Sequence, residues 1–134
     1  MKNVSWCVAP LALIISCLSG CTTQAEVHRI VAVEAENLAK IQLGMSAAEV
    51  RNIMGTEMLN LGSEGMETRP IRTDKFLSKD GNPIEVQFYR SAYRRWDEQC
   101  TDDETTAVIF VKGKVDTITS GVYFVPTLME VRRR

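Results

Sequence analysis

The chain has few side chains that could serve as a nucleophile, a general base or a metal ligand. It contains one histidine, His28, and four cysteines, of which Cys100 lies far along the chain from the other three. A thiol nucleophile needs a base beside it, and His28 is remote from Cys100 in sequence. Zinc usually takes three or four nitrogen and sulfur ligands, more than these residues can supply. We therefore expect a protein that is not an enzyme, with no catalytic residues, no cofactor and no metal.

Carboxylates form the one dense group of potential oxygen ligands. Five of them lie between Asp97 and Glu104, and three arginines precede or adjoin them between Arg90 and Arg95. Calcium takes six to eight oxygens, but the spacing lacks the alternating pattern and the glycine of an EF-hand loop. The arginines would also compete for the carboxylates. We expect a solvated loop with internal ion pairs that each contribute little.

Aromatic and arginine side chains adjoin this charged segment. Tyr89, Tyr93, Arg94 and Trp96 belong to the residue types that are enriched in protein interfaces. Strand alternation is expected to turn Tyr89 away from the core. These four residues form a candidate binding patch, and the alternative is that Trp96 simply covers the end of the sheet.

The N-terminus has the pattern of an export signal. Lys2 precedes an apolar run from Val4 to Ile15 that is too short to span a bilayer, and Leu18-Ser19-Gly20-Cys21 follows. This pattern resembles bacterial lipoprotein signals, which implies cleavage of residues 1–20 and acylation of Cys21. Thr22, which follows the cysteine, favours the outer membrane by the general sorting pattern of lipoproteins. An ordinary signal peptide with a chance cysteine is the alternative.

Charge and cysteine count restrict the partners. The chain carries 16 basic and 17 acidic side chains, so no basic surplus favours nucleic acid. Several acyl chains on Cys21 would give stable membrane anchoring. Cys100 then has no partner in the mature chain. Three alternatives stay open: it is buried, it is reactive, or it pairs with another molecule, as in a homodimer through Cys100.

Two helices are expected before the strands. An apolar stripe at helical spacing predicts the first, with Glu34 off the stripe; its members are Val27, Ile30, Val31, Ala35, Leu38 and Ile41. Ser46 and Glu49 have capping-box spacing, so a second helix of roughly two turns is expected to begin after Ser46. Gly55 is expected to end it in a left-handed conformation.

The rest of the chain reads as an antiparallel meander. Residues 57–70 show no period and are expected to form a loop, and residues 71–77 form a weak strand. Clean alternation predicts a half-buried strand over residues 84–89, and two more strands are expected over residues 105–111 and 115–120. The predicted fold is α+β, with two short N-terminal helices packed on a three- to four-stranded antiparallel sheet. We expect a tether over residues 21–32, the domain over 33–125 and a basic tail over 126–134.

The stretch Leu43-Gly44-Met45-Ser46, followed by a short helix and Met54-Gly55, resembles the BamE (SmpA/OmlA) family of outer-membrane lipoproteins. The segments at residues 79–81, 86–90, 97–101 and 108–110 are similar to a functionally uncharacterised family of proteobacterial lipoproteins. The resemblance implies two helices against a three-stranded sheet, and a non-catalytic binding or scaffolding module for an envelope protein complex at the periplasmic face of the outer membrane. The same layout also resembles β-lactamase inhibitory proteins, so the alternative is a periplasmic inhibitor or envelope-stress sensor that binds a soluble enzyme.

Overall fold

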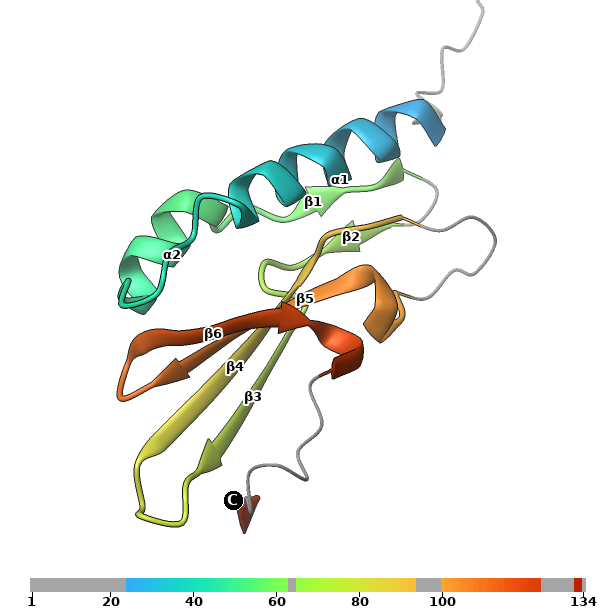
Figure 1. Ribbon diagram of the computed structural model, residues 1–134. Helices are drawn as coiled ribbons and strands as arrows, with labels where there is room; N and C mark the ends of the chain where they lie inside the picture. The colour runs from blue at the N-terminus through green and yellow to red at the C-terminus, as the bar shows by residue number, and fades with distance from the viewer. Residues whose placement is uncertain (1–23, 63–64, 94–99, 124–131, 134) are drawn as a thin grey trace, which may run out of the picture.

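The fold is the predicted α+β arrangement, in which two helices lie over one face of an antiparallel sheet (Figure 1). It is seen here in a computed structural model that describes residues 24–62, 65–93, 100–123 and 132–133. The signal, Cys21, Arg94 and Trp96 lie outside the described residues. Within the described part of the chain, no helix is both long and apolar enough to cross a membrane.

Helix α1 (Gln24–Leu38) begins earlier than the sequence suggested. Val27 and Val31 are buried against Leu59 and Leu61, so the apolar stripe is packed from its first turn. The helix therefore begins inside the 21–32 segment that we expected to be a tether. The polar residues at its start do not prevent this, because an acidic side chain is favourable near the positive end of a helix.

Helix α2 (Ala47–Met54) confirms the capping-box prediction. The Ser46 N–H donates to a Glu49 carboxylate oxygen at 2.7 Å, and the Glu49 N–H donates to the Ser46 hydroxyl at 3.3 Å. Gly55 ends the helix with φ of +80°, the left-handed region that glycine adopts without strain. Val50 and Met54 of this helix are buried in the core.

The main sheet has the strand order β6-β5-β4-β3-β7, and every pair is antiparallel. Its strands are β3 (Arg72–Leu77), β4 (Pro83–Arg90), β5 (Thr105–Val111), β6 (Lys114–Ser120) and β7 (Arg132–Arg133). Four strands form the predicted meander, and the two-residue β7 adds a fifth beside β3 from the segment expected to be a tail. Short 3₁₀ helices η2 (Asp102–Glu104) and η3 (Gly121–Tyr123) flank β5 and β6.

A second, smaller sheet corrects the prediction that residues 57–70 form a loop. Strands β1 (Leu59–Asn60) and β2 (Met66–Glu67) pair as a short antiparallel hairpin. Strands of two residues are too short to show a periodic pattern, which is why sequence reading missed them. The buried Leu59 fixes this hairpin against α1.

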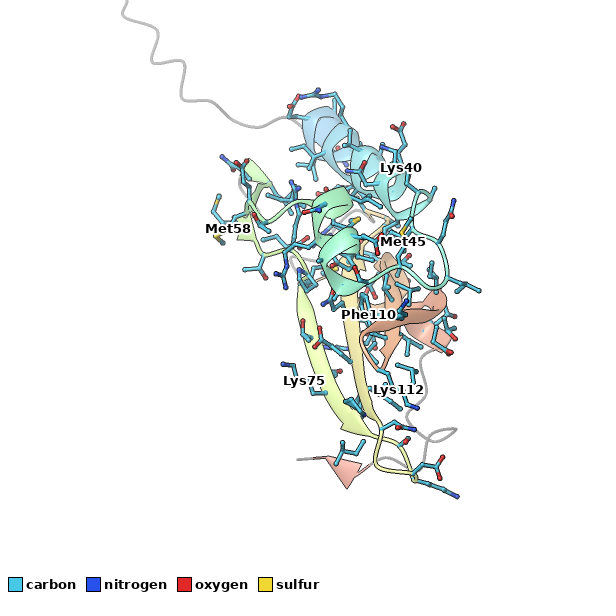
Figure 2. All side chains as sticks on the ribbon, turned by 90° about the vertical axis from the view of Figure 1, so that its left-hand side faces the viewer. Lys40, Met45, Met58, Lys75, Phe110 and Lys112 are labelled. Carbon is cyan, nitrogen blue, oxygen red and sulfur yellow. The ribbon has the colours of Figure 1, made fainter. Side chains whose placement is uncertain are left out.

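Apolar residues cover both faces of the main sheet. On the helix side, Val108 and Phe110 pack against α2, and Figure 2 shows Phe110 below that helix. On the other side, residues of β3, β4 and β5 form a second buried cluster: Phe76, Ile84, Val86, Phe88, Ala107 and Ile109. Strand β4 forms where the alternation predicted it, but it is buried on both faces rather than half-buried.

Candidate functional site

Tyr89 is buried and is therefore not part of an exposed binding patch, contrary to the prediction. This side chain is 3% exposed, belongs to the core under the helices, and donates its hydroxyl to Gln87 Oε1 at 2.6 Å. Burial raises the pKa of the Tyr89 phenol to about 12. The prediction was wrong because the face of β4 expected to meet solvent is the face that the helices cover. Tyr93 is half-buried beside α1, where its ring meets His28 edge-on with centroids 5.0 Å apart.

The charged segment is also more buried than expected. Glu104 is 1% exposed, and its carboxylate accepts from the Thr101 N–H at 3.1 Å. Its backbone oxygen accepts from the Ser91 and Ala92 N–H groups, which holds η2 against the end of β4. The expectation of a solvated loop is therefore wrong for Glu104, and residues 94–99 of the segment lie outside the described residues.

An open groove lies between α1 and β1 and is the best candidate for a functional surface. Its volume is about 480 Å³. We call it the α1–β1 groove, and it is lined by Glu26, Arg29, Ile30, Val33, Glu34, Met58, Leu59, Asn60 and Arg69. One wall is a face of α1, and the other is made of β1, Met58 directly before it, and Arg69 after β2.

The exposed apolar side chains of this region gather at the groove. Val33 on α1 is 48% exposed and Met58 before β1 is 50% exposed, and both line it. Met66, 57% exposed, pairs across the hairpin with Asn60 and extends the apolar surface along β2. Large apolar side chains left in solvent and rimmed by polar groups are typical of interaction surfaces.

Two of the four charged residues that line the groove, Glu34 and Arg69, lie close to each other. Glu34 is 2% exposed, and Arg69 Nε lies 3.5 Å from its carboxylate. Burial raises the pKa of the Glu34 carboxyl above its usual value of 4.5; Arg69 acts in the opposite direction and Glu67 in the same one. Arg69 Nε is buried and makes no hydrogen bond to any residue that the structure describes.

Arg69 also ties the groove to the end of α2. Its Nη1 donates to the Met54 carbonyl at 2.7 Å, one of the carbonyls that a helix end leaves without an intrahelical partner. Gly55 permits this approach, because a Cβ there would lie 2.9 Å from Nη1. The glycine that sequence reading assigned to a helix end therefore also makes room for a groove residue.

A second arginine–glutamate pair joins β4 to β2. Arg90 Nε and Nη2 donate to the Glu67 carboxylate at 2.6 to 2.9 Å in a bidentate arrangement. Arg90 is 6% exposed. Sequence reading placed Arg90 with the acidic residues that follow it, but its partner comes from β2.

The main sheet has another hollow, of about 390 Å³, between the start of α2 and the β3–β4 hairpin. Its charged residues, Lys75 and Glu85, face each other across the strands at 3.8 Å. Figure 2 shows Lys75 projecting from β3 well below the helices. Neither residue is a buried group of the kind that the α1–β1 groove contains, so the groove is the stronger candidate.

The remaining reactive group is Cys100. It is a free, half-buried cysteine, and burial raises the pKa of its thiol to about 11. A raised pKa disfavours the thiolate form that attacks electrophiles. Among the described residues, no three His, Cys, Asp or Glu side chains are grouped so as to hold a metal ion.

Comparison with protein-family models gives a match over most of the chain. Residues 12–121 match the model of a protein family of unknown function, DUF3192, and the matched range includes the Leu18–Cys21 segment. The sequence matches no curated protein and no solved structure.

Proposed function

The chain belongs to the DUF3192 family, and we propose that it is a lipid-anchored, non-catalytic binding or scaffolding module for an envelope protein complex. In this proposal, Cys21 carries the acyl chains and the protein lies at the periplasmic face of the outer membrane. The α1–β1 groove holds the partner. The helices-on-sheet layout agrees with the BamE resemblance, although a shared layout does not by itself carry a function.

The observation that carries the proposal is the exposure of Val33 and Met58 on opposite walls of one groove. Large apolar side chains are usually buried in small domains, so two half-exposed ones that line a common hollow favour a partner that covers them. Glu26 and Arg29 supply a polar rim, the usual setting of an interface core.

The position of the groove fits a membrane-bound partner. Only Thr22 and Thr23 separate Cys21 from Gln24, where α1 begins, so three residue-to-residue steps of at most about 11 Å in total join the proposed anchor to the helix. Glu26 and Arg29 line the groove within the first two turns of that helix. A lipid on Cys21 would therefore hold the groove close to the membrane surface.

The anchor is tested by replacing the cysteine. Cys21→Ser should abolish incorporation of labelled palmitate and leave an unprocessed precursor or a soluble product. A Cys100→Ser chain is the matched control and should incorporate label like the wild type. Equal labelling of the Cys21→Ser chain would show that the anchor assignment is wrong.

The groove is tested by site-specific photocrosslinking in intact cells. A photoreactive residue at Val33 or Met58 should give the same partner adduct. Lys40 is exposed and lies on the other side of α1 from Met58 in Figure 2, so the same probe at Lys40 should not. Adducts at Lys40 equal to those at the groove would reject the groove as the contact surface. A single soluble enzyme as the partner would favour the inhibitor alternative.

A further inference from the structure

The outer edge of β6 is an open edge of the main sheet. At its start, the loop before α2 covers it, because the Val115 N–H donates to the Met45 oxygen at 2.8 Å and the Gly44 N–H donates to the Val115 oxygen at 2.7 Å. Beyond that point, no strand in the described residues pairs with Asp116–Ser120 on this side. In Figure 1 the loop lies at one end of β6 and η3 at the other.

The two edges of the sheet are protected differently. Strand β3 carries Arg72, Asp74 and Lys75, and β7 pairs with its last residues, Phe76 and Leu77. Charges and a covering strand are two devices by which proteins block pairing at an edge. The β6 segment from Asp116 to Ser120 carries a single charge and no proline or lysine.

The backbone of β6 presents its free groups at the middle of this open segment. Both backbone groups of Val115 point outward to the loop, so Val115 and its partner Phe110 form a non-hydrogen-bonded pair. Asp116 is the extra residue of the bulge, after which Ile118 opposes Val108. Alternation beyond the bulge then directs the N–H and C=O of Ile118 outward.

We propose that two copies of this chain pair edge to edge through β6, antiparallel, about a two-fold axis at Ile118. The outward groups of Ile118 then bond to those of Ile118 in the second copy. Thr117 lies opposite Thr119 of the second copy, and Asp116 lies opposite Ser120. Paired threonines are favourable cross-strand neighbours, and no like charges meet.

The exposed apolar residues at the two ends of β6 support this arrangement. Leu43 is 68% exposed and precedes Gly44 at the covered end, and Val122 is 50% exposed in η3 at the other end. An antiparallel two-fold brings the covered end of one copy to the η3 end of the other. Leu43 of each copy then contacts Val122 of the other copy. The two-fold axis makes this contact twice, so both solvent-exposed side chains are covered in both copies.

This pairing uses none of the groove residues and does not depend on the groove partner. Failure of the dimer would leave the proposed binding function standing, and failure of the groove would leave the dimer standing. Five paired residues per copy form a small interface. For that reason the first test is made in cells, where the chain keeps its natural surroundings.

Disulfide trapping tests the register. In a Cys100→Ser background, Thr117→Cys combined with Thr119→Cys places thiols opposite one another at a non-hydrogen-bonded pair, where Cα atoms lie about 4.5 Å apart, within disulfide range. Mild oxidation of intact cells should give a covalent dimer. Thr73→Cys with Lys75→Cys, at the same spacing on β3, is the control and should stay monomeric. A β6 variant that forms no more dimer than this control, or that is trapped on a different protein, would overturn the proposal.

Introducing charges at Thr117 and Thr119 gives a second test that does not rely on oxidation. Thr117→Lys with Thr119→Lys sets like charges opposite each other and should weaken the dimer about tenfold. Thr117→Lys with Thr119→Glu sets opposite charges there and should restore the dissociation constant to within about threefold of wild type. Sedimentation of the full chain isolated in detergent measures both. If the two variants behave alike, the residues are not opposite one another and the proposed pairing is wrong.

Discussion

Two arginine–glutamate pairs fix the segment around β2, and they are built differently. Arg90 and Glu67 form a bidentate pair in which two guanidinium nitrogens donate to one carboxylate at 2.6 to 2.9 Å. Arg69 and Glu34 approach only to 3.5 Å, and in the described part of the chain Arg69 Nε makes no hydrogen bond. The first pair lies within the fold, and the second pair lies at the groove.

The difference separates a tightly bonded structural pair from a looser pair whose two residues line the groove. A buried ion pair is favourable only when its geometry is close to ideal, and the bidentate contact of Arg90 with Glu67 has such a geometry. Arg69 Nε is buried beside the Glu34 carboxylate at 3.5 Å and makes no hydrogen bond within the described residues. The Arg69–Glu34 pair therefore holds the fold less firmly than the Arg90–Glu67 pair.

The largest expected loss of stability comes from breaking the bidentate Arg90–Glu67 pair. Arg90→Ala should destabilise the fold by about 3 to 5 kcal/mol, because it leaves the Glu67 carboxylate buried without its partner. Lys75→Ala breaks a solvent-exposed pair and should cost no more than about 1 kcal/mol. Urea denaturation measures both. Equal midpoints for the two variants would show that the Arg90 pair is no more structural than a surface pair.

Sequence reading found the elements whose signals are local. The Ser46–Glu49 capping box, Gly55 and the alternation of β4 each lie within a few residues, and each predicted its element correctly. The β5–β6 turn also has a local cause, because Lys112 and Gly113 both adopt positive φ, as a two-residue type I′ turn requires. The α+β class followed from the order of these elements.

The groove could not be predicted in the same way, because its residues meet only through tertiary packing. One local signal was present, but the sequence analysis placed Glu34 off the apolar stripe of the first helix. Val27, Val31, Glu34 and Leu38 are the buried residues of α1, and their three- and four-residue steps follow one helix face. A carboxylate on such a face indicates a buried charge with a partner elsewhere. Nothing local identifies Arg69 as that partner.

The next largest effect is on the reactivity of the Cys100 thiol, whose pKa depends in part on both members of the Arg90–Glu67 pair. Burial raises its pKa to about 11, Arg90 acts in the opposite direction, and Glu67 acts with burial. The shift from an ordinary thiol pKa of 9.0 amounts to about a 100-fold loss of thiolate near neutral pH. Alkylation of the native chain should therefore be about 100-fold slower than that of the urea-unfolded chain at the same pH, corrected for the effect of urea on the reagent. Equal rates would show that Cys100 is a reactive thiol and would reopen the enzyme hypothesis.

Arg69→Ala should have a smaller effect on stability than Arg90→Ala, about 1 to 2 kcal/mol, because it removes the bond to the Met54 carbonyl and one loose ion contact. Its effect on the photocrosslink at Val33 should be larger than that of Arg90→Ala, measured under conditions in which both variants are folded. The reverse order in either measurement would contradict the division between a structural pair and a groove pair.

The smallest expected effect is the pH dependence that comes from Glu34. Because the folded state raises the pKa of this carboxyl above 4.5, it binds the proton more tightly than the unfolded chain does. The stability that Glu34 contributes is therefore fully present below pH 4.5 and is lost as the pH rises through the folded-state pKa. Glu34→Gln should remove this loss, so its melting temperature relative to wild type should increase as the pH rises above 4.5 and then level off.

Glu49 provides a control of opposite sign. Its hydrogen bonds to the Ser46 backbone and hydroxyl lower its pKa, so its contribution is present above the unfolded value and lost as the pH falls. Glu49→Gln should therefore differ from wild type least in acid, where Glu34→Gln has lost its advantage. Circular dichroism melts from about pH 3 to about pH 8 compare the three chains. Parallel pH curves for wild type and Glu34→Gln would mean that Arg69 compensates fully for the burial of Glu34, and the distinction between the two pairs would then rest on geometry alone.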